Sequence, residues 1–158
     1  MKKVLSGGLA VFAGMVCLPN PVSWHQTHRP PAPDYREDPR LNRLQKFFRS
    51  ADCPAQKYSG VFLEAADEYD LDWRLLPSIS FIESTGGKAA RNNNLFGWDS
   101  GRAEFPSAIA GIHEVGYYLT HSGLYRNKSV DGILATYNPN LDYVEKVKSI
   151  MRRISPSE

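Results

Sequence analysis

The sequence predicts a mainly α-helical domain that occupies most of the chain. Hydrophobic residues recur three or four positions apart in several segments after residue 40, which is typical of amphipathic helices that bury one face. Outside one loop after residue 83, no segment alternates as a strand does, and no internal repeat is present. A chain of 158 residues with 42% hydrophobic and 23% charged residues has the composition of one globular domain.

The first 39 residues are expected to lie outside this domain. Lys2 and Lys3 precede an apolar run, which is the pattern of an export signal, and the run is shorter than the roughly 20 residues of a membrane-spanning helix. We predict a signal peptide over residues 1–18, a proline-rich tether over 19–39 and the folded domain over 40–158. A lipid anchor at Cys17 or an uncleaved leader are alternatives. Each places the domain in the periplasm or outside the cell, with the leader as its one membrane contact.

Six helices are predicted in the domain. The third of them is the most hydrophobic, and Pro77 lies within its first turns, where a missing amide proton costs least. A loop rich in Gly and Asn follows over residues 84–104 and is expected to be irregular or minimally β. The predicted helices cover about residues 40–53, 55–69, 73–83, 106–119, 129–137 and 141–154.

Charge and potential ligands exclude several classes of function. The first 33 residues contain three basic and no acidic residues, so the remainder is nearly neutral and offers no basic face for nucleic acid. His113, Glu114 and His121 match no metal-ligand motif. Cys53 is alone once the leader is removed, and no motif places a base beside it. We therefore predict no metal, no cofactor and a monomeric protein.

Glu83 is the strongest candidate for a catalytic residue. It ends the most apolar helix, beside Phe81 and Ile82. Burial disfavours the charged form of a carboxyl group and raises its pKa, which suits a general acid near neutral pH. A surface glutamate at a helix end would show the same local pattern.

The loop after Glu83 carries side chains suited to a sugar. Asn93 and Asn94 offer amide donors and acceptors for hydroxyl and acetamido groups, although such residues are also common in turns. Trp98 could stack on the apolar face of a pyranose ring. Phe96 could do the same, but a phenylalanine here more often fills the core beneath the loop.

Three motifs, in order along the chain, carry a family resemblance. Residues 81–87 read F-I-E-S-T-G-G, residues 93–97 read N-N-L-F-G, and residues 135–147 read A-T-Y-N-P-N-L-D-Y-V-E-K-V. These segments resemble the E-S-x-x-G, N-N-L-F-G and Y-x-x-(D)P-x-Y-x-x-K-(V/I) motifs of the glucosaminidase family of the lysozyme superfamily, which is mannosyl-glycoprotein endo-β-N-acetylglucosaminidase-like. The third segment is also similar to the A-Y-N motif of soluble lytic transglycosylases.

The resemblance implies a lysozyme-like helical fold that acts on peptidoglycan glycan strands without a metal. It implies that Glu83 is the catalytic acid and that Tyr137 lines the active site and hydrogen-bonds near the reacting sugar. Tyr137 could instead be a packing residue at a helix end. The substrate-binding residues expected with them are Ser84, Asn93, Asn94, Phe96, Trp98 and Asn138.

One departure from the family leaves the mechanism open. The family has a β-hairpin with a second carboxylate after the N-N-L-F-G loop, whereas this chain has only residues 98–104 there. Glycosidases commonly use two carboxylates, and Asp99 or Glu104 is the candidate for the second. We predict a β-N-acetylglucosaminidase-like hydrolase. The alternatives are a lytic transglycosylase that forms 1,6-anhydromuramic ends, and a catalytically inactive wall-binding or secretion-accessory module.

Overall fold

The computed structural model describes residues 33–156, so the predicted leader and most of the predicted tether lie outside the described residues. The described chain is mainly α-helical, as the sequence predicts. A single isolated bridge between Arg91 and Asn94 is the β structure found within it. The helices are α1 (Pro39–Ser50), the 3₁₀ helix η1 (Pro54–Tyr58), α2 (Ser59–Glu68), α3 (Leu75–Ser84), α4 (Ala108–His121), α5 (Val130–Tyr137) and α6 (Leu141–Ile154).

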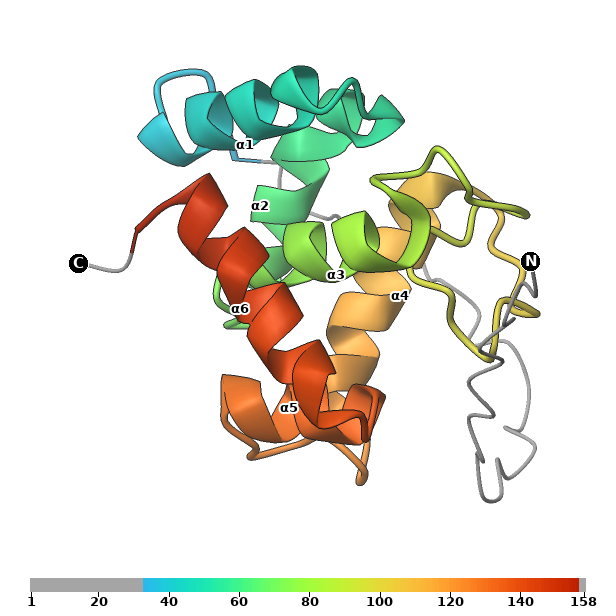
Figure 1. The fold of residues 1–158 in the computed structure, drawn as a ribbon. Helices are drawn as coiled ribbons and strands as arrows, with labels where there is room; N and C mark the ends of the chain where they lie inside the picture. The colour runs from blue at the N-terminus through green and yellow to red at the C-terminus, as the bar shows by residue number, and fades with distance from the viewer. Residues whose placement is uncertain (1–32, 157–158) are drawn as a thin grey trace, which may run out of the picture. The chain divides into compact units, whose positions relative to one another are not determined.

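Helix α3 forms the centre of the domain (Figure 1). Its first six residues, from Leu75 to Ser80, are all buried. It packs against α6 and α2, while α2 also packs against α1 and α4, and α5 packs against α6. The third helix, which the sequence predicts to be the most apolar, is therefore the central helix of the domain. Glu83 lies in its last turn.

A series of buried aromatic rings links the helices to the loop after α3. Phe48 of α1 stacks on Phe62 of α2 at 5.8 Å, and Phe62 meets Phe96 of the loop edge-on at 6.5 Å. All three side chains have no exposed surface. Burial of one phenylalanine stabilises a fold by roughly 1.5–3 kcal/mol, so this series fixes the loop to the core.

Side-chain caps begin most of the helices. Asp38 accepts from the Arg40 amide at 2.8 Å, and Pro39 occupies the first position of α1. The Ser107, Ser129 and Asn140 side chains likewise accept from amides in the first turns of α4, α5 and α6. These short polar residues satisfy amide protons that have no partner within the helix.

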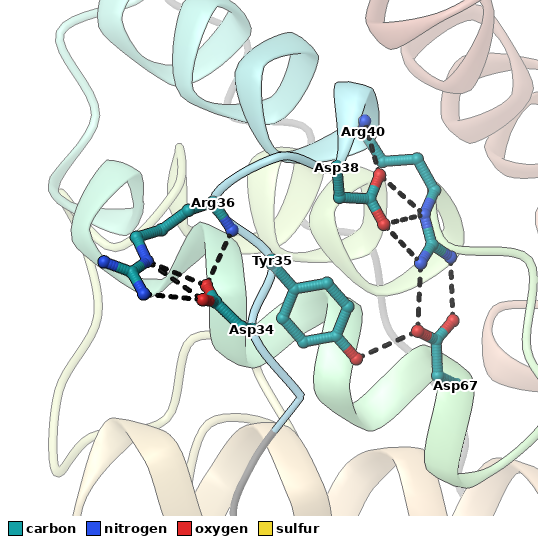
Figure 2. A network of polar contacts seen from close by, with 6 residues as sticks. All are labelled: Asp34, Tyr35, Arg36, Asp38, Arg40 and Asp67. Atoms are coloured by element: carbon teal, nitrogen blue, oxygen red, sulfur yellow. Dashed lines mark hydrogen bonds and ion pairs between the residues drawn. The ribbon is translucent and has the colours of Figure 1, made fainter.

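A polar network ties the start of α1 to the end of α2 (Figure 2). Arg40 donates to Asp38 and to Asp67, each at 2.7 Å, and the Tyr35 hydroxyl donates to Asp67 at 2.9 Å. The hydrogen bonds from Arg40 hold the pKa of both carboxyl groups below the usual range. Tyr35 thus packs on the domain although it precedes the first helix.

Some helix bounds differ from those predicted. Residues 55–69 form a 3₁₀ turn and then α2 rather than one helix, and the Ser59 hydroxyl donates to the Gln56 carbonyl at their junction. Helix α3 begins two residues later than expected, because the Asp72 side chain accepts from the Arg74 amide and forms a turn. Helix α4 begins after its Ser107 cap rather than at Pro106. No helix of the described residues is long and apolar enough to cross a membrane.

Candidate active site

The end of α3 presents the Glu83 carboxyl at a partly buried position. Thr85 adopts a left-handed conformation with φ of 54°, and Gly86 follows with φ of 59°. A Cβ at Gly86 would lie 2.8 Å from Cβ of Cys53, so only glycine fits this close turn. The helix therefore ends at Ser84, one residue after Glu83.

The loop after α3 passes directly over the Glu83 carboxyl. A Cβ at Gly97 would lie 3.0 Å from Oε2 of Glu83, and Gly97 has a positive φ of 61°. Both the space and the backbone conformation thus favour glycine here. The glycine of the N-N-L-F-G motif lets the backbone approach the carboxyl that we predict to be catalytic.

Tyr143 of α6 is the hydrogen-bond partner of Glu83. Its hydroxyl donates to Oε1 at 2.7 Å, and its side chain is buried. Burial raises the pKa of Glu83 above its ordinary value, and the hydrogen bond from Tyr143 opposes part of this rise. Burial and the nearby Glu83 charge likewise raise the pKa of Tyr143. Glu83 therefore holds its proton to higher pH than an exposed glutamate.

Tyr137 lies beside this pair, at the end of α5. Its ring stacks on that of Tyr143, with centroids 5.9 Å apart and planes within 5°. Its hydroxyl donates to the Phe96 carbonyl. Burial, and then the Glu83 charge, raise the pKa of Tyr137 well above its usual value. This contact ties α5 to the loop over Glu83, and the expected hydrogen bond near the sugar stays a prediction.

Trp98 belongs to a cluster of rings next to Tyr137. Trp98 is partly buried. Its ring centroid lies 5.8 Å from that of Tyr118 of α4, 5.6 Å from that of Tyr137 and 6.2 Å from that of the buried Tyr125. The Tyr118 ring is nearly parallel to the indole, at 22°. These contacts hold Trp98 in place and connect α4 and α5 beside the Glu83 carboxyl.

Ser84, Asn94 and Phe96 support the loop instead of facing a ligand. The buried Ser84 hydroxyl donates to the Leu95 carbonyl at 2.7 Å and accepts from the Gly87 amide at 2.9 Å. Phe96 is fully buried in the core. A sugar cannot reach these side chains without displacing the loop, so their predicted role in substrate binding is corrected to one of support.

Asn94 has the same supporting role. Its side-chain amide donates to the Trp98 and Ala103 carbonyls at 3.0 and 3.1 Å. Its oxygen accepts from the Trp98 amide at 2.9 Å and from the Phe96 amide at 3.3 Å. The buried Asn94 side chain therefore holds the backbone of Phe96 and Trp98, two of the residues that we expected to bind substrate.

Asn93 and Asn138 remain nearer the surface. The exposed Asn93 donates to the Phe105 carbonyl at 2.8 Å, and the partly buried Asn138 accepts from the Asn140 amide at 3.0 Å. Each keeps one end of its amide group outside these bonds. Both stay candidates for substrate binding, with Trp98.

The two candidates for a second carboxylate are engaged elsewhere. Asp99 forms an ion pair with Arg102 at 2.7 Å, and Glu104 accepts from the Asn92 side chain at 2.8 Å. Within residues 33–156, no other carboxylate contributes to the pKa of Glu83. The contacts of Asp99 and Glu104 thus lie within the loop itself.

Sequence reasoning missed two residues of the site, Tyr143 and Gly97. Tyr143 belongs to the third motif, but its hydroxyl meets a residue 60 positions away, and no local pattern reveals that contact. Gly97 was part of the N-N-L-F-G motif without a role of its own. A glycine within a loop motif can indicate that the backbone there passes close to another group.

Other potential sites lie away from Glu83. One cavity of about 380 Å³ is lined by Pro39, Arg40, Arg43, Trp73, Arg74, Ser155 and Pro156. Another of about 470 Å³ adjoins Cys53 and η1. No group of three or more His, Cys, Asp or Glu residues in the described part of the chain is placed to hold a metal ion. Comparison with protein-family models, curated proteins and solved structures gave no match.

Proposed function

We propose that this domain cleaves the glycan strands of peptidoglycan, with Glu83 as the general acid, in a lysozyme-like arrangement. The observation that carries the proposal is the environment of one carboxyl group. Glu83 is partly buried, a tyrosine hydroxyl is its partner at 2.7 Å, and a glycine backbone passes over it. A general acid needs such an environment, because its proton must be retained near the working pH.

The surrounding rings favour a sugar as the substrate. Trp98 and Tyr118 are partly buried, and Trp98 lies between the rings of Tyr118 and Tyr137. Asn93 and Asn138 add amide groups near the surface. Together with the motif resemblance, these features support an N-acetylated glycan better than a peptide or a nucleic acid.

In the proposed reaction, Glu83 gives its proton to the glycosidic oxygen as the bond from the anomeric carbon to that oxygen breaks. The substrate's acetamido oxygen stabilises the positive charge that develops at the anomeric carbon. A water molecule then attacks this carbon and gives its proton to the Glu83 carboxylate. The enzyme returns to its starting state, and one strand has a new reducing-end N-acetylglucosamine.

Lytic transglycosylation is the second candidate, and one observation favours it. Asp99 is paired with Arg102 and Glu104 with Asn92, so both candidates for a second carboxylate are bonded within the loop. In transglycosylation the 6-hydroxyl of the muramyl residue attacks its own anomeric carbon, and Glu83 takes the proton. No second protein carboxylate is required, and the product ends in 1,6-anhydromuramic acid.

The experiment is a digest of purified peptidoglycan analysed by mass spectrometry. New reducing-end N-acetylglucosamine supports hydrolysis, and anhydromuramic ends, one water lighter, support transglycosylation. The Glu83→Gln variant serves as the control for contaminating enzymes. Intact strands that nevertheless bind the protein would overturn the enzymatic proposal and favour the wall-binding module.

The proposed location is beyond the inner membrane, on the strength of the leader predicted over residues 1–18. A reporter that is active only after export should give signal when it is fused to this leader. A reporter signal confined to the cytoplasm would contradict this part of the proposal.

A further inference from the structure

Three arginines line the cavity of about 380 Å³ that lies between the start of α1 and the end of α6. Arg40 and Arg43 belong to the first half of α1, and Arg74 directly precedes α3. The lining residues include no acidic residue. A cavity lined by charges of one sign concentrates ions of the opposite sign, so this cavity favours an anion.

Arg43 has most of its hydrogen-bonding capacity available for a ligand. Within residues 33–156, its hydrogen-bond partner is the Ser155 hydroxyl, and no carboxylate pairs with it. A guanidinium group carries five N–H donors, of which this bond uses one. The Arg43 side chain is also exposed, so a ligand can reach it from solvent.

Arg74 is held in place at the edge of the same cavity. It donates from Nε and Nη2 to Asp72 at 2.9 and 2.6 Å, and from Nη1 to the Ser155 carbonyl at 3.0 Å. Arg40 is fixed in a similar way by its own carboxylate partners (Figure 2). A side chain that is already ordered loses less entropy when it binds a ligand. Arg43 therefore supplies the charge, and its two neighbours supply donors in fixed positions.

The size and lining of the cavity favour an organic anion. Cavities that bind small molecules typically measure about 300–1,000 Å³, and this one lies at the lower end of that range. The partly buried Trp73 also lines it, and an indole ring packs well on an apolar group. A ligand with an oxyanion next to an apolar group would use both parts of the lining.

We propose that this cavity binds a carboxylate of a peptide, with Arg43 and Arg74 as donors and Trp73 in contact with the adjoining apolar group. A planar guanidinium matches a carboxylate with two parallel hydrogen bonds. Two carboxylates of a peptidoglycan stem share this chemistry: the C-terminal one, and the one that a glutamate keeps when it is linked through its side chain. The choice of a stem peptide rests on the proposed function.

The cavity and Glu83 lie at opposite ends of α3. Trp73 and Arg74 precede the helix, whereas Glu83 lies in its last turn. A helix of ten residues is about 15 Å long. A peptide held in the cavity therefore leaves the Glu83 carboxyl open to a glycan, and we expect this site to contribute to binding of the wall rather than to bond cleavage.

The test measures the binding of soluble stem pentapeptides to the whole protein by calorimetry. One probe has both carboxylates free, and in two others either the terminal or the glutamate carboxylate is converted to an amide. Loss of a charge-assisted hydrogen bond predicts about tenfold weaker binding of an amidated probe. The probe that loses affinity identifies the carboxylate that the cavity holds. Added salt should weaken the binding of the free probe.

Substitutions of Arg43 test its role in the cavity. Arg43→Gln removes its charge and should weaken binding of the free probe about tenfold. Arg43→Lys should keep part of the affinity, because an ammonium group keeps the charge but lacks the planar pair of donors. Arg49→Gln is the matched control, since it removes another exposed arginine of α1 that does not line the cavity. Circular dichroism checks that each variant is folded.

Nuclear magnetic resonance of the indole N–H groups locates the ligand. The free probe should shift the Trp73 signal and leave that of Trp98, beside Tyr137, in place. Equal affinities for the three probes, an equal loss in Arg43→Gln and Arg49→Gln, unchanged binding in Arg43→Gln, or a shift of Trp98 alone would overturn the inference. The probes contain no glycosidic bond, so this result is independent of whether the protein cleaves glycan.

Discussion

Carboxylates have opposite environments at the start of α1 and at the end of α3. Asp38 and Asp67 share the guanidinium of Arg40, and this pairing holds the pKa of both below the usual range (Figure 2). Glu83 accepts from the Tyr143 hydroxyl, and burial raises its pKa. The first arrangement favours the charged form and ties two helices together, whereas the second keeps a proton available. The same chemical group is structural in one region and suited to catalysis in the other.

The largest expected effect separates these two roles. Glu83→Gln keeps the shape of the side chain but cannot donate a proton to a leaving group, so glycan cleavage should fall at least about a hundredfold. Asp67→Asn should leave cleavage nearly unchanged. Both are measured by the release of soluble fragments from purified peptidoglycan, with circular dichroism as the check on folding. Comparable loss of activity in the two variants would end the distinction between the regions.

A smaller effect is expected from Tyr143, the tyrosine that bonds to Glu83. Tyr143→Phe removes a hydrogen bond that favours charged Glu83, so the pKa of Glu83 should rise further. The general acid must be protonated, so the basic limb of the pH–activity profile should move to higher pH. Maximal activity should fall about two- to tenfold, the value of one hydrogen bond.

Tyr35→Phe is the matched control, because it removes the corresponding hydroxyl from Asp67. Its pH–activity profile should coincide with that of the parent protein. A basic limb that stays in place, or moves down, in Tyr143→Phe would show that this hydroxyl does not control the proton on Glu83.

The network at α1 should affect stability rather than activity. Asp67 is partly exposed, with 43% of its side chain accessible, and Arg40 keeps Asp38 when Asp67 is changed. Asp67→Asn should therefore destabilise the domain by only about 0.5–1 kcal/mol. Urea unfolding at low and high salt measures this loss. The loss should shrink in high salt, because screening weakens exposed ion pairs; a loss independent of salt would exclude an electrostatic origin.

The sequence predicted the helices better than it predicted the contacts between them. Periodicity and caps such as Ser129 are local signals, and α5 and α6 begin close to where those signals place them. The junction of η1 and α2 was missed because the apolar spacing continues across it. Local signals also identified Glu83, since it ends the most apolar helix.

The roles of the loop residues required the fold. Asn94 and Phe96 have side chains that suit either sugar binding or support, and only burial distinguishes the two. Tyr143 reaches Glu83 because α6 packs on α3, which is a tertiary fact without a local pattern.

The smallest expected effect is the pH dependence of stability in the two carboxylate variants. A carboxyl group with a raised folded pKa opposes folding when it is charged, and folding gains as pH falls through that pKa. Glu83→Gln should therefore be more stable than the parent protein near neutral pH. This advantage should shrink as pH falls to about 4.3, the ordinary pKa of glutamate.

A depressed folded pKa has the opposite effect, so Asp67→Asn should be less stable than the parent protein above about pH 3.9. That deficit should shrink only as pH falls further, through the lowered pKa of Asp67. Thermal unfolding of the three proteins across acidic pH would show the two variants approaching the parent from opposite sides and in different pH ranges. Two curves on the same side would show that one of the two carboxyl groups has been assigned the wrong environment.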